Sequence, residues 1–265
     1  MNILVTINSN YRYHLAVMVK SLMTNNPGEK FDIYVLNRGL NDDDKEFLNN
    51  SLISADATYH FISVPTDLFE GAPTEKRYPH EIYFRIFSFM FLPENVDKVL
   101  YLDPDLVVNK SIRNLYDMDF EGNYFIATTH VRKFMLFINR IRMGAKKENV
   151  YMNTGVMMMN LKELKEVVKK EEIYAFIKKK KHSMILPDQD ILYALYGDKV
   201  KLIDDKIYNL SDRMIAINNL SKKNVKIDKK WVEENNVIVH FYGRNKPWKP
   251  DYDGILQEYY DKYRV

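Results

Sequence analysis

The sequence predicts an α/β fold in which helices cover both faces of a parallel sheet. Three short apolar runs rich in β-branched residues, 2–7, 30–37 and 57–64, are typical of buried strands. Helical patterns separate these runs, and such alternation of strands and helices favours parallel pairing. The 265 residues contain no internal repeat and no Pro/Gly-rich linker, so we expect a single domain.

The first helix is expected directly after the first strand, because Leu15, Val19 and Leu22 recur at helical spacing. A second helix should follow the second strand, with Asn41 or Asp42 as its N-cap. Further acidic residues lie in its first turn, where the helix dipole favours negative charge. Both helices would therefore connect neighbouring parallel strands.

The middle of the chain continues this alternation. The stretch 80–92 is apolar almost all round, which predicts a buried helix, and its one cation, Arg85, needs a partner from outside that helix. Strands are expected at 97–108, 123–130 and 150–161. A surface excursion with apolar residues of its own separates the last two strands.

The last third adds two helices and two strands. Residues 162–182 form one long amphipathic pattern, and another helix is expected from Pro187, with Gly197 just beyond its end. The late strands are predicted at 200–204 and 236–243.

Composition excludes several classes of function. Lys plus Arg (39) barely exceed Asp plus Glu (36), and no basic stripe is interleaved with aromatic residues, so nucleic acid is not an expected partner. The absence of cysteine excludes disulfides, thiolate metal sites and cysteine nucleophiles. The chain shows no signal peptide and no apolar run of about 18 residues. We therefore expect a cytoplasmic protein with at most weak peripheral contact to the inner face of the membrane.

Two carboxylates interrupt the apolar strand 97–108. Asp103 and Asp105 flank Pro104, which cannot donate a ladder hydrogen bond and favours a strand end. Side chains two residues apart on extended backbone point the same way, so both would converge where open α/β sheets bind ligands. Close like charges need a cation, and oxygen ligands favour a divalent metal. A solvated loop is the alternative, and phosphoryl transfer of the haloacid-dehalogenase kind is disfavoured because the pair does not follow the first strand.

A histidine near the end of the chain is the natural third ligand. His240 ends a predicted strand, Gly243 permits close backbone approach, and Lys246 and Trp248 follow within eight residues. A metal, a glycine turn and a lysine together suit a diphosphate. An imidazole beside two carboxylates favours Mn²⁺ over Mg²⁺. The alternative is a hydrogen-bonded structural histidine.

Six segments in this order resemble those of family 8 glycosyltransferases of the lipopolysaccharide galactosyltransferase and glycogenin type: VTINSNY, HEIYFRI, DKVLYLDPDLVV, YMNTGVMMMNL, PDQDIL and HFYGRNKPW. They extend from residue 2 to about 249. The resemblance implies a GT-A fold with a single mixed, mostly parallel sheet. It places a nucleotide-binding half at about 1–110 and a donor-sugar and acceptor half at about 111–265. It also implies retaining transfer of a hexose from a UDP-sugar to a glycan acceptor of the cell envelope, dependent on Mn²⁺, with Mg²⁺ as the alternative ion.

The resemblance also assigns roles to individual residues. The metal ligands would be Asp103, Asp105 and His240. The nucleotide would be bound by Thr6, Asn8, Asn10, Tyr11, Pro104, Gly243 and Lys246. The donor sugar would be bound by Arg85, Asn153, Gly155, Asp188 and Gln189. For Arg85, an ion pair with a core carboxylate is an equally good interpretation.

Asp188 and Gln189 are the catalytic candidates. Gln189 has no ionisable group and would be a poor nucleophile, but its amide could hydrogen-bond the sugar or stabilise an oxocarbenium-like centre. We therefore favour front-face attack by the acceptor, with an oxygen of UDP taking the proton, over a covalent intermediate. The alternative for Asp188 is a capping role at the start of its helix.

Two positions depart from the family pattern. Asn8 stands where many members have an aspartate at the uracil edge, and His130 stands where galactosyltransferases have an acidic residue near the sugar. Galactose and glucose therefore both stay open as the donor sugar. The acceptor should be held by 130–149 and 205–235. The other candidate functions are nucleotidyl transfer, which would want a Gly-rich basic signature after the first strand, and nucleotide-sugar binding without transferase activity.

Overall fold

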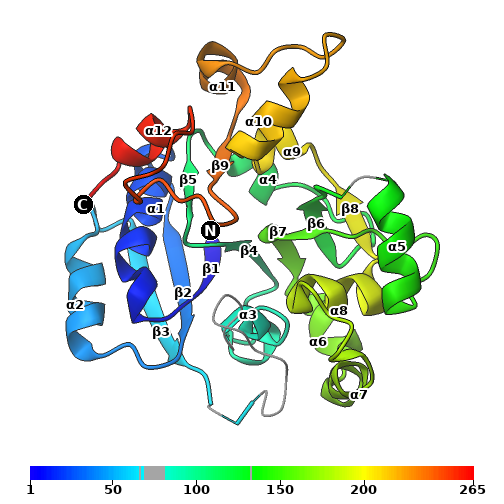
Figure 1. The fold of residues 1–265 in the computed structure, drawn as a ribbon. Coiled ribbons are helices and arrows are strands. Elements are labelled where there is room, and N and C mark those ends of the chain that lie inside the picture. Colours follow the sequence, from blue (N-terminus) through cyan, green and yellow to red (C-terminus); the bar gives the residue numbers. More distant parts are fainter. Residues whose placement is uncertain (66, 69–80, 132) are drawn as a thin grey trace.

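The computed structural model describes residues 1–65, 67–68, 81–131 and 133–265. A seven-stranded sheet forms its centre, in the order β3-β2-β1-β4-β7-β6-β8 (Figure 1). Its strands are β1 (Asn2–Ile7), β2 (Phe31–Asn37), β3 (Ala57–Ser63), β4 (Lys98–Leu102), β6 (Phe125–Thr128), β7 (Asn153–Asn160) and β8 (Val200–Leu202). Only β7 runs antiparallel to its neighbours, β4 and β6. The prediction of an α/β fold with a mostly parallel sheet is confirmed.

Helices pack on both faces of this sheet. The predicted early helices are α1 (Arg12–Thr24) and α2 (Asp42–Asn50), and Asn41 caps α2 in a reciprocal capping box with Asp44. On the other face lie α3 (Glu81–Phe84), α6 (Leu161–Val167), α7 (Lys170–Lys180) and α8 (Pro187–Tyr196). The remaining helices are η1 (Ser9–Tyr11), η2 (Ser88–Met90), α4 (Arg113–Tyr116), α5 (Lys133–Met143), α9 (Asp205–Tyr208), α10 (Asp212–Asn219), α11 (Lys229–Asn235) and α12 (Gln257–Asp261).

Two predicted helices are shorter than expected. The stretch 80–92 forms only α3 and η2 within its described part, and the hydroxyl of Ser88, the first residue of η2, donates to the Arg85 carbonyl at 3.0 Å. The pattern at 162–182 divides into α6 and α7. Leu164 and Ile173 are both buried in one cluster, yet nine residues are about two and a half helical turns, which would place them on opposite sides of one continuous helix. The break lets both side chains reach the same core.

The predicted strand 97–108 is interrupted at Asp103–Asp105. Its second part becomes β5 (Leu106–Val108), which leaves the main sheet and pairs antiparallel with β9 (Ile238–His240). The register joins Leu106 to His240. The sequence analysis did not foresee this second, two-stranded sheet, although Pro104 marks the point of the break.

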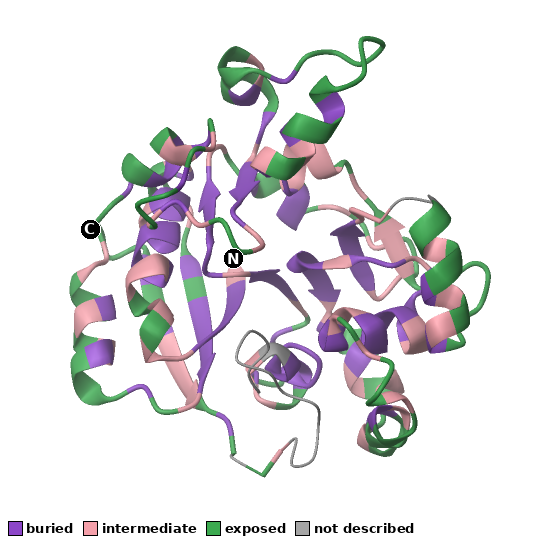
Figure 2. Ribbon diagram, viewed as in Figure 1, coloured by how far each residue is buried: buried purple, intermediate pink, exposed green. Residues whose placement is uncertain are grey.

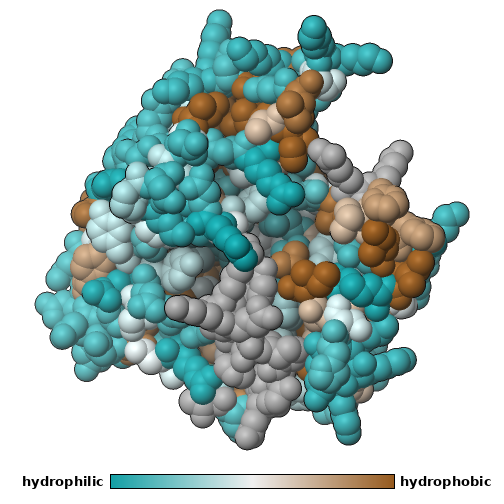
Figure 3. Space-filling view, viewed as in Figure 1, coloured by the Kyte–Doolittle hydropathy of each residue, from teal (hydrophilic) through white to brown (hydrophobic). Residues whose placement is uncertain are grey.

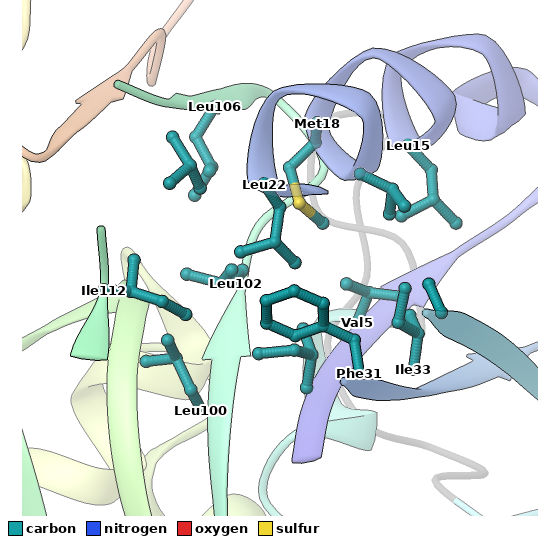
Figure 4. Packing of buried hydrophobic residues seen from close by; sticks show 14 of the residues in the cluster. Val5, Leu15, Met18, Leu22, Phe31, Ile33, Leu100, Leu102, Leu106 and Ile112 are labelled. Atoms are coloured by element: carbon teal, nitrogen blue, oxygen red, sulfur yellow. The ribbon is translucent and has the colours of Figure 1, made fainter. Parts of the chain in front are cut away.

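An apolar layer covers each face of the central sheet, and the inner strands β1, β4, β6 and β7 are mostly buried (Figure 2). The layer between the sheet and α1 includes Val5, Phe31, Ile33, Leu15, Met18 and Leu22 (Figure 4). The opposite layer joins Leu4, Tyr101 and Met157 of the sheet to Phe84, Leu164 and Ile191 of the covering helices. None of the helices in the described ranges is long and apolar enough to cross a bilayer.

A buried serine ties β5 to α1 and supplies a test of this packing. The Val108 amide donates to the Ser21 hydroxyl at 2.9 Å, and Ser21 is fully buried. Ser21→Ala should lower the free energy of unfolding by about 1–3 kcal/mol, because the buried amide loses its partner. Urea denaturation measures this loss. Thr24→Ala, which removes an exposed hydroxyl from the same helix, should change stability by less than about 0.5 kcal/mol. Equal losses for both variants would contradict the assigned role of Ser21.

Candidate functional site

The break between β4 and β5 and the end of β9 bring three charged or ionisable side chains together. Each of Asp103, Asp105 and His240 offers one ligand atom, and these atoms lie within 4.8 Å of one another. The Nε2 atom of His240 is 3.1 Å from Asp105 Oδ1 and 3.7 Å from Asp103 Oδ2. The structure thus assembles the three predicted metal ligands from segments about 135 residues apart in the chain.

A network of amides fixes the orientation of the His240 ring. Asn209 donates from Nδ2 to Thr128 Oγ1 and to Asn153 Oδ1, both at 2.9 Å. Its Oδ1 therefore accepts from His240 Nδ1, 2.8 Å away. With the proton on Nδ1, the lone pair of a neutral ring lies on Nε2, which faces Asp105. This arrangement of an imidazole oriented through its other nitrogen is typical of metal-binding histidines. The donor set of two carboxylates and one imidazole therefore fits a divalent cation.

Gly155 of β7 allows the imidazole and the carboxylates to approach each other. A Cβ at this position would lie 2.3 Å from His240 Cε1 and 2.8 Å from Asp103 Oδ2. The Gly155 carbonyl also accepts from the Asp103 amide at 2.8 Å. Asn153 lies beside it and accepts from the Gly155 amide at 3.0 Å. Both residues, expected at the donor sugar, lie behind the ligand cluster and support it.

Lys246 balances the charge of Asp105. Asp105 is 8% exposed, and its carboxylate forms an ion pair with the Lys246 ammonium. Burial alone would raise the pKa of Asp105, but Lys246 and His240 lower it well below its ordinary value. Trp248 holds this segment in place by stacking on His14 of α1, with ring centroids 3.6 Å apart. The carboxylate is therefore ionised and available as a ligand.

Arg85 has two acidic partners, both at the site. Its Nη2 lies 3.1 Å from Asp103 Oδ1, and its Nε lies 3.4 Å from Asp188 Oδ2. The guanidinium also covers the Tyr101 ring at 4.4 Å and donates to the Thr154 carbonyl at 2.9 Å. The partner required from outside the helix is thus confirmed. The ion-pair interpretation of Arg85 is therefore confirmed, and its guanidinium and both carboxylate partners line the same cavity.

The capping role considered for Asp188 is wrong. Helix α8 begins at Pro187 with Leu186 as its N-cap, so Asp188 lies inside the first turn. Its carboxylate accepts from Thr154 Oγ1 at 2.7 Å in addition to pairing with Arg85. Gln189 follows and is partly buried. The Asp188 carboxylate is therefore held by two partners, one of them cationic.

These groups surround a cavity of about 240 Å³. Twelve of the predicted site residues line it: Thr6, Asn8, Tyr11, Arg85, Asp103, Pro104, Asp105, Asp188, Gln189, His240, Gly243 and Lys246. Asn10, Asn153 and Gly155 are not among its lining residues. The sequence analysis missed Glu81, Thr154 and Tyr242, which also line it. Tyr242 could have been found from its position between His240 and Gly243.

A second cavity, of about 760 Å³, adjoins the first, and Leu186 and Tyr242 line both. Its walls come from residues 129–151 and 205–224, together with Ile185. His130 stacks on Tyr242 here, with ring centroids 4.8 Å apart, and neither ring nitrogen has a hydrogen-bond partner in the described chain. Burial, with a contribution from His240, lowers the pKa of His130 to about 4.

The close approach at Gly155 predicts the effect of adding one methyl group. Gly155→Ala should displace His240 and weaken Mn²⁺ binding at least about ten-fold, since groups that orient metal ligands have effects of this size. Paramagnetic resonance titration measures free Mn²⁺ directly. Val156→Ala is the control, because it opens a void in the core at the next position but leaves the ring in place. Unchanged Mn²⁺ affinity in Gly155→Ala would show that the ring is not a ligand.

Comparisons with known proteins agree with this geometry. The model of the family described as "Glycosyl transferase family 8" matches residues 2–251. The lipopolysaccharide 1,2-glucosyltransferase of Escherichia coli is 25% identical over 251 residues, which cover 91% of this chain and 71% of that protein. General stress protein A of Bacillus subtilis is 25% identical over 268 residues, covering 99% and 91%. The lipopolysaccharide 1,3-galactosyltransferase of Salmonella typhimurium is 24% identical over 266 residues, covering 93% and 72%.

Solved structures show the same fold. The galactosyltransferase LgtC, in complex with donor and acceptor sugar analogs, has a TM-score of 0.83 at 24% identity, covering 100% of this chain and 95% of that chain. The glycosyltransferase GlyE of Streptococcus pneumoniae has a TM-score of 0.71 at 22% identity, covering 100% and 60%. These likenesses identify the fold as GT-A. Because the family model covers nearly the whole chain, the protein belongs to glycosyltransferase family 8.

Proposed function

We propose that this glycosyltransferase moves galactose or glucose from a UDP-sugar to a glycan acceptor, with retention at the anomeric carbon and with Mn²⁺ as its metal. The observation that carries the proposal is the cluster of Asp103, Asp105 and oriented His240 in one cavity with two cations, Arg85 and Lys246. A metal beside two protein cations suits a diphosphate leaving group, whose developing charge needs fixed positive groups. The imidazole ligand favours Mn²⁺ over Mg²⁺.

The cation and the diphosphate would be held by different parts of this cluster. Asp103, Asp105 and His240 would bind the metal, which would supply Lewis-acid stabilisation of the diphosphate's charge. The Lys246 ammonium pairs with Asp105 and lies at the cavity wall, so a short movement would bring it to a phosphate oxygen. Gly243 has a φ of 100°, a conformation that glycine adopts without strain. It lets the backbone turn closely around the cluster.

The uridine would lie at the carboxyl end of β1, where Thr6, Asn8 and Tyr11 line the cavity. Thr6 Oγ1 is 2.9 Å from the Tyr101 hydroxyl, which donates to Asp103 at 2.8 Å. This chain of hydrogen bonds connects the proposed nucleotide wall to a proposed metal ligand. These residues belong to the proposed nucleotide-binding half, whereas His240 and Lys246 come from the other half.

The contacts of Asp188 favour front-face transfer. In this step the bond between the anomeric carbon and the UDP oxygen breaks, while the acceptor hydroxyl forms a new bond on the same face. The acceptor proton passes to an oxygen of the departing diphosphate. A covalent route would need a nucleophile at the anomeric carbon, but Gln189 cannot ionise, and one oxygen of Asp188, Oδ2, is engaged by both Arg85 and Thr154. The Gln189 amide would instead orient the sugar.

The acceptor would occupy the second cavity, which the segments expected to hold it line from both sides. Its shared wall with the first cavity, Leu186 and Tyr242, would place an acceptor hydroxyl next to the donor sugar. The His130 ring would form part of the wall there. Several relatives are named as lipopolysaccharide glucosyl- or galactosyltransferases, which supports a cell-envelope glycan as the acceptor.

Thermal denaturation with nucleotides tests the donor site. We expect UDP to raise Tm only when Mn²⁺ is present, and ADP to have little effect. Asp105→Asn should abolish this rise, because it removes a charged ligand. Asp190→Asn is the matched control, since Asp190 is also buried and ion-paired, with Arg142, but does not line the first cavity. A normal UDP-dependent shift in Asp105→Asn would contradict the metal assignment, and a shift with ADP alone would point to another nucleotide chemistry.

Mass spectrometry tests the proposed mechanism. Incubation with UDP-galactose or UDP-glucose and Mn²⁺, without acceptor, should give slow release of UDP and no glycosyl adduct on the protein. The donor that is hydrolysed faster identifies the transferred sugar. Gln189→Ala provides the comparison, because a side-chain adduct at this position could not form in it. A hexose attached to Asp188 or Gln189 in the unaltered protein would overturn front-face transfer, and failure to hydrolyse either donor would favour a binding protein without transferase activity.

A further inference from the structure

One face of α5 carries large apolar side chains that the fold leaves exposed. Phe134, Phe137, Ile138 and Ile141 are 72%, 53%, 39% and 66% exposed. Their spacing places them in one line along the helix, and we call these four residues the α5 stripe. Contiguous apolar side chains on a surface mark sites of interaction with proteins or membranes. The catalytic proposal makes no use of this stripe.

The other faces of α5 already have their partners. Leu136 and Met143 pack in a small cluster with Tyr151 and Tyr193. Met135, Asn139 and Arg142 line the second cavity instead. The helix is thus attached through one face and forms a cavity wall through another. The fold therefore does not need the apolar side chains of the α5 stripe to hold the helix in place.

Cations surround the α5 stripe. Segments 133–147 and 178–181 contain nine Lys and Arg residues and no Asp or Glu, although the whole chain has a net charge of only +3. The Lys180 ammonium donates to the Arg142 carbonyl at 2.8 Å, which brings the lysine run at the end of α7 against α5. Arg140 lies over the Phe137 ring at 5.3 Å. Within the described ranges, Arg140 and Lys178, Lys179 and Lys181 form no ion pair with a carboxylate.

We propose that the α5 stripe and the neighbouring lysines dock on an anionic lipid bilayer. An exposed apolar line flanked by unpaired cations matches an interfacial helix, which buries its apolar face among lipid chains and places its cations at the headgroups. A second copy of this chain is the poorer occupant, because two equally cationic surfaces would repel each other. The proposal concerns a surface outside the active site and does not depend on the proposed donor or mechanism.

Docking through the α5 stripe would bring the bilayer close to the second cavity, the proposed site of the acceptor. Ile185, which is 62% exposed, lines this cavity beside Met135 of α5. Across the cavity, α10 is followed by Leu220 and Val225, which are 83% and 72% exposed. Apolar side chains gather over both α5 and α10 (Figure 3). A bilayer at this surface would adjoin the acceptor cavity, which suits a glycan carried on a lipid.

Vesicle flotation with the full chain tests the proposal. Vesicles of equimolar phosphatidylcholine and phosphatidylglycerol should bind the protein, and vesicles of phosphatidylcholine alone should bind it at least about ten-fold more weakly. The triple variant Phe134→Ser, Phe137→Ser, Ile141→Ser should lose about ten-fold or more of the binding to anionic vesicles. Lys178→Glu combined with Lys179→Glu should do the same, and high salt should weaken binding of the unaltered protein.

Ile53→Ser is the matched control, because it removes a 51% exposed side chain from the turn between α2 and β3, away from the α5 stripe. It should bind vesicles as the unaltered protein does. Circular dichroism and Tm of each variant verify folding, since all the altered side chains are on the surface. Absence of binding to anionic vesicles, or equal binding by the triple variant, would overturn the proposal. A dimer in light scattering that the triple variant abolishes would assign the α5 stripe to a second copy instead.

Discussion

The site is built around two carboxylates held close together at a break in a buried strand. Asp103 follows β4 and Asp105 precedes β5, and their like charges are compensated by cations from two other parts of the chain. Arg85 pairs with the first, Lys246 with the second, and His240 lies near both. Each compensating group also faces the cavity or forms part of the metal cluster. The requirement to balance these two charges thus brings together the groups that a metal and a diphosphate need.

Much of this arrangement could be predicted from the sequence because it depends on local patterns. Alternating strands and helices predict the sheet, and Pro104 between two aspartates predicts a strand end. Other features depend on tertiary contacts that no local pattern reports. Asn209 orients His240, and Gly155 makes room for it, but an isolated asparagine and a glycine in a strand have many other uses. The break between α6 and α7 likewise depends on tertiary contacts, because side chains of both helices pack into the same core.

The two adjoining cavities divide the proposed reaction in space. The first holds the charged groups of the proposed metal and diphosphate site, whereas aromatic, apolar and polar side chains from 129–151 and 205–224 line the second. The proposed chemistry of the donor therefore rests on more contacts than the proposed place of the acceptor. The exposed face of α5 adds a further constraint, since it would determine where the enzyme meets its acceptor. In this proposal, the first cavity carries out the chemistry on the donor, and the α5 stripe beside the second cavity brings the enzyme to its acceptor.

Anomalous diffraction from crystals grown with Mn²⁺ and UDP tests the central claim most directly. Our account predicts one manganese peak in bonding contact with Asp103, Asp105 and His240 Nε2, with the diphosphate of UDP beside it and Lys246 moved from Asp105 towards a phosphate oxygen. UDP bound in this cavity without a manganese peak at the three side chains, or manganese bound elsewhere, would contradict the account.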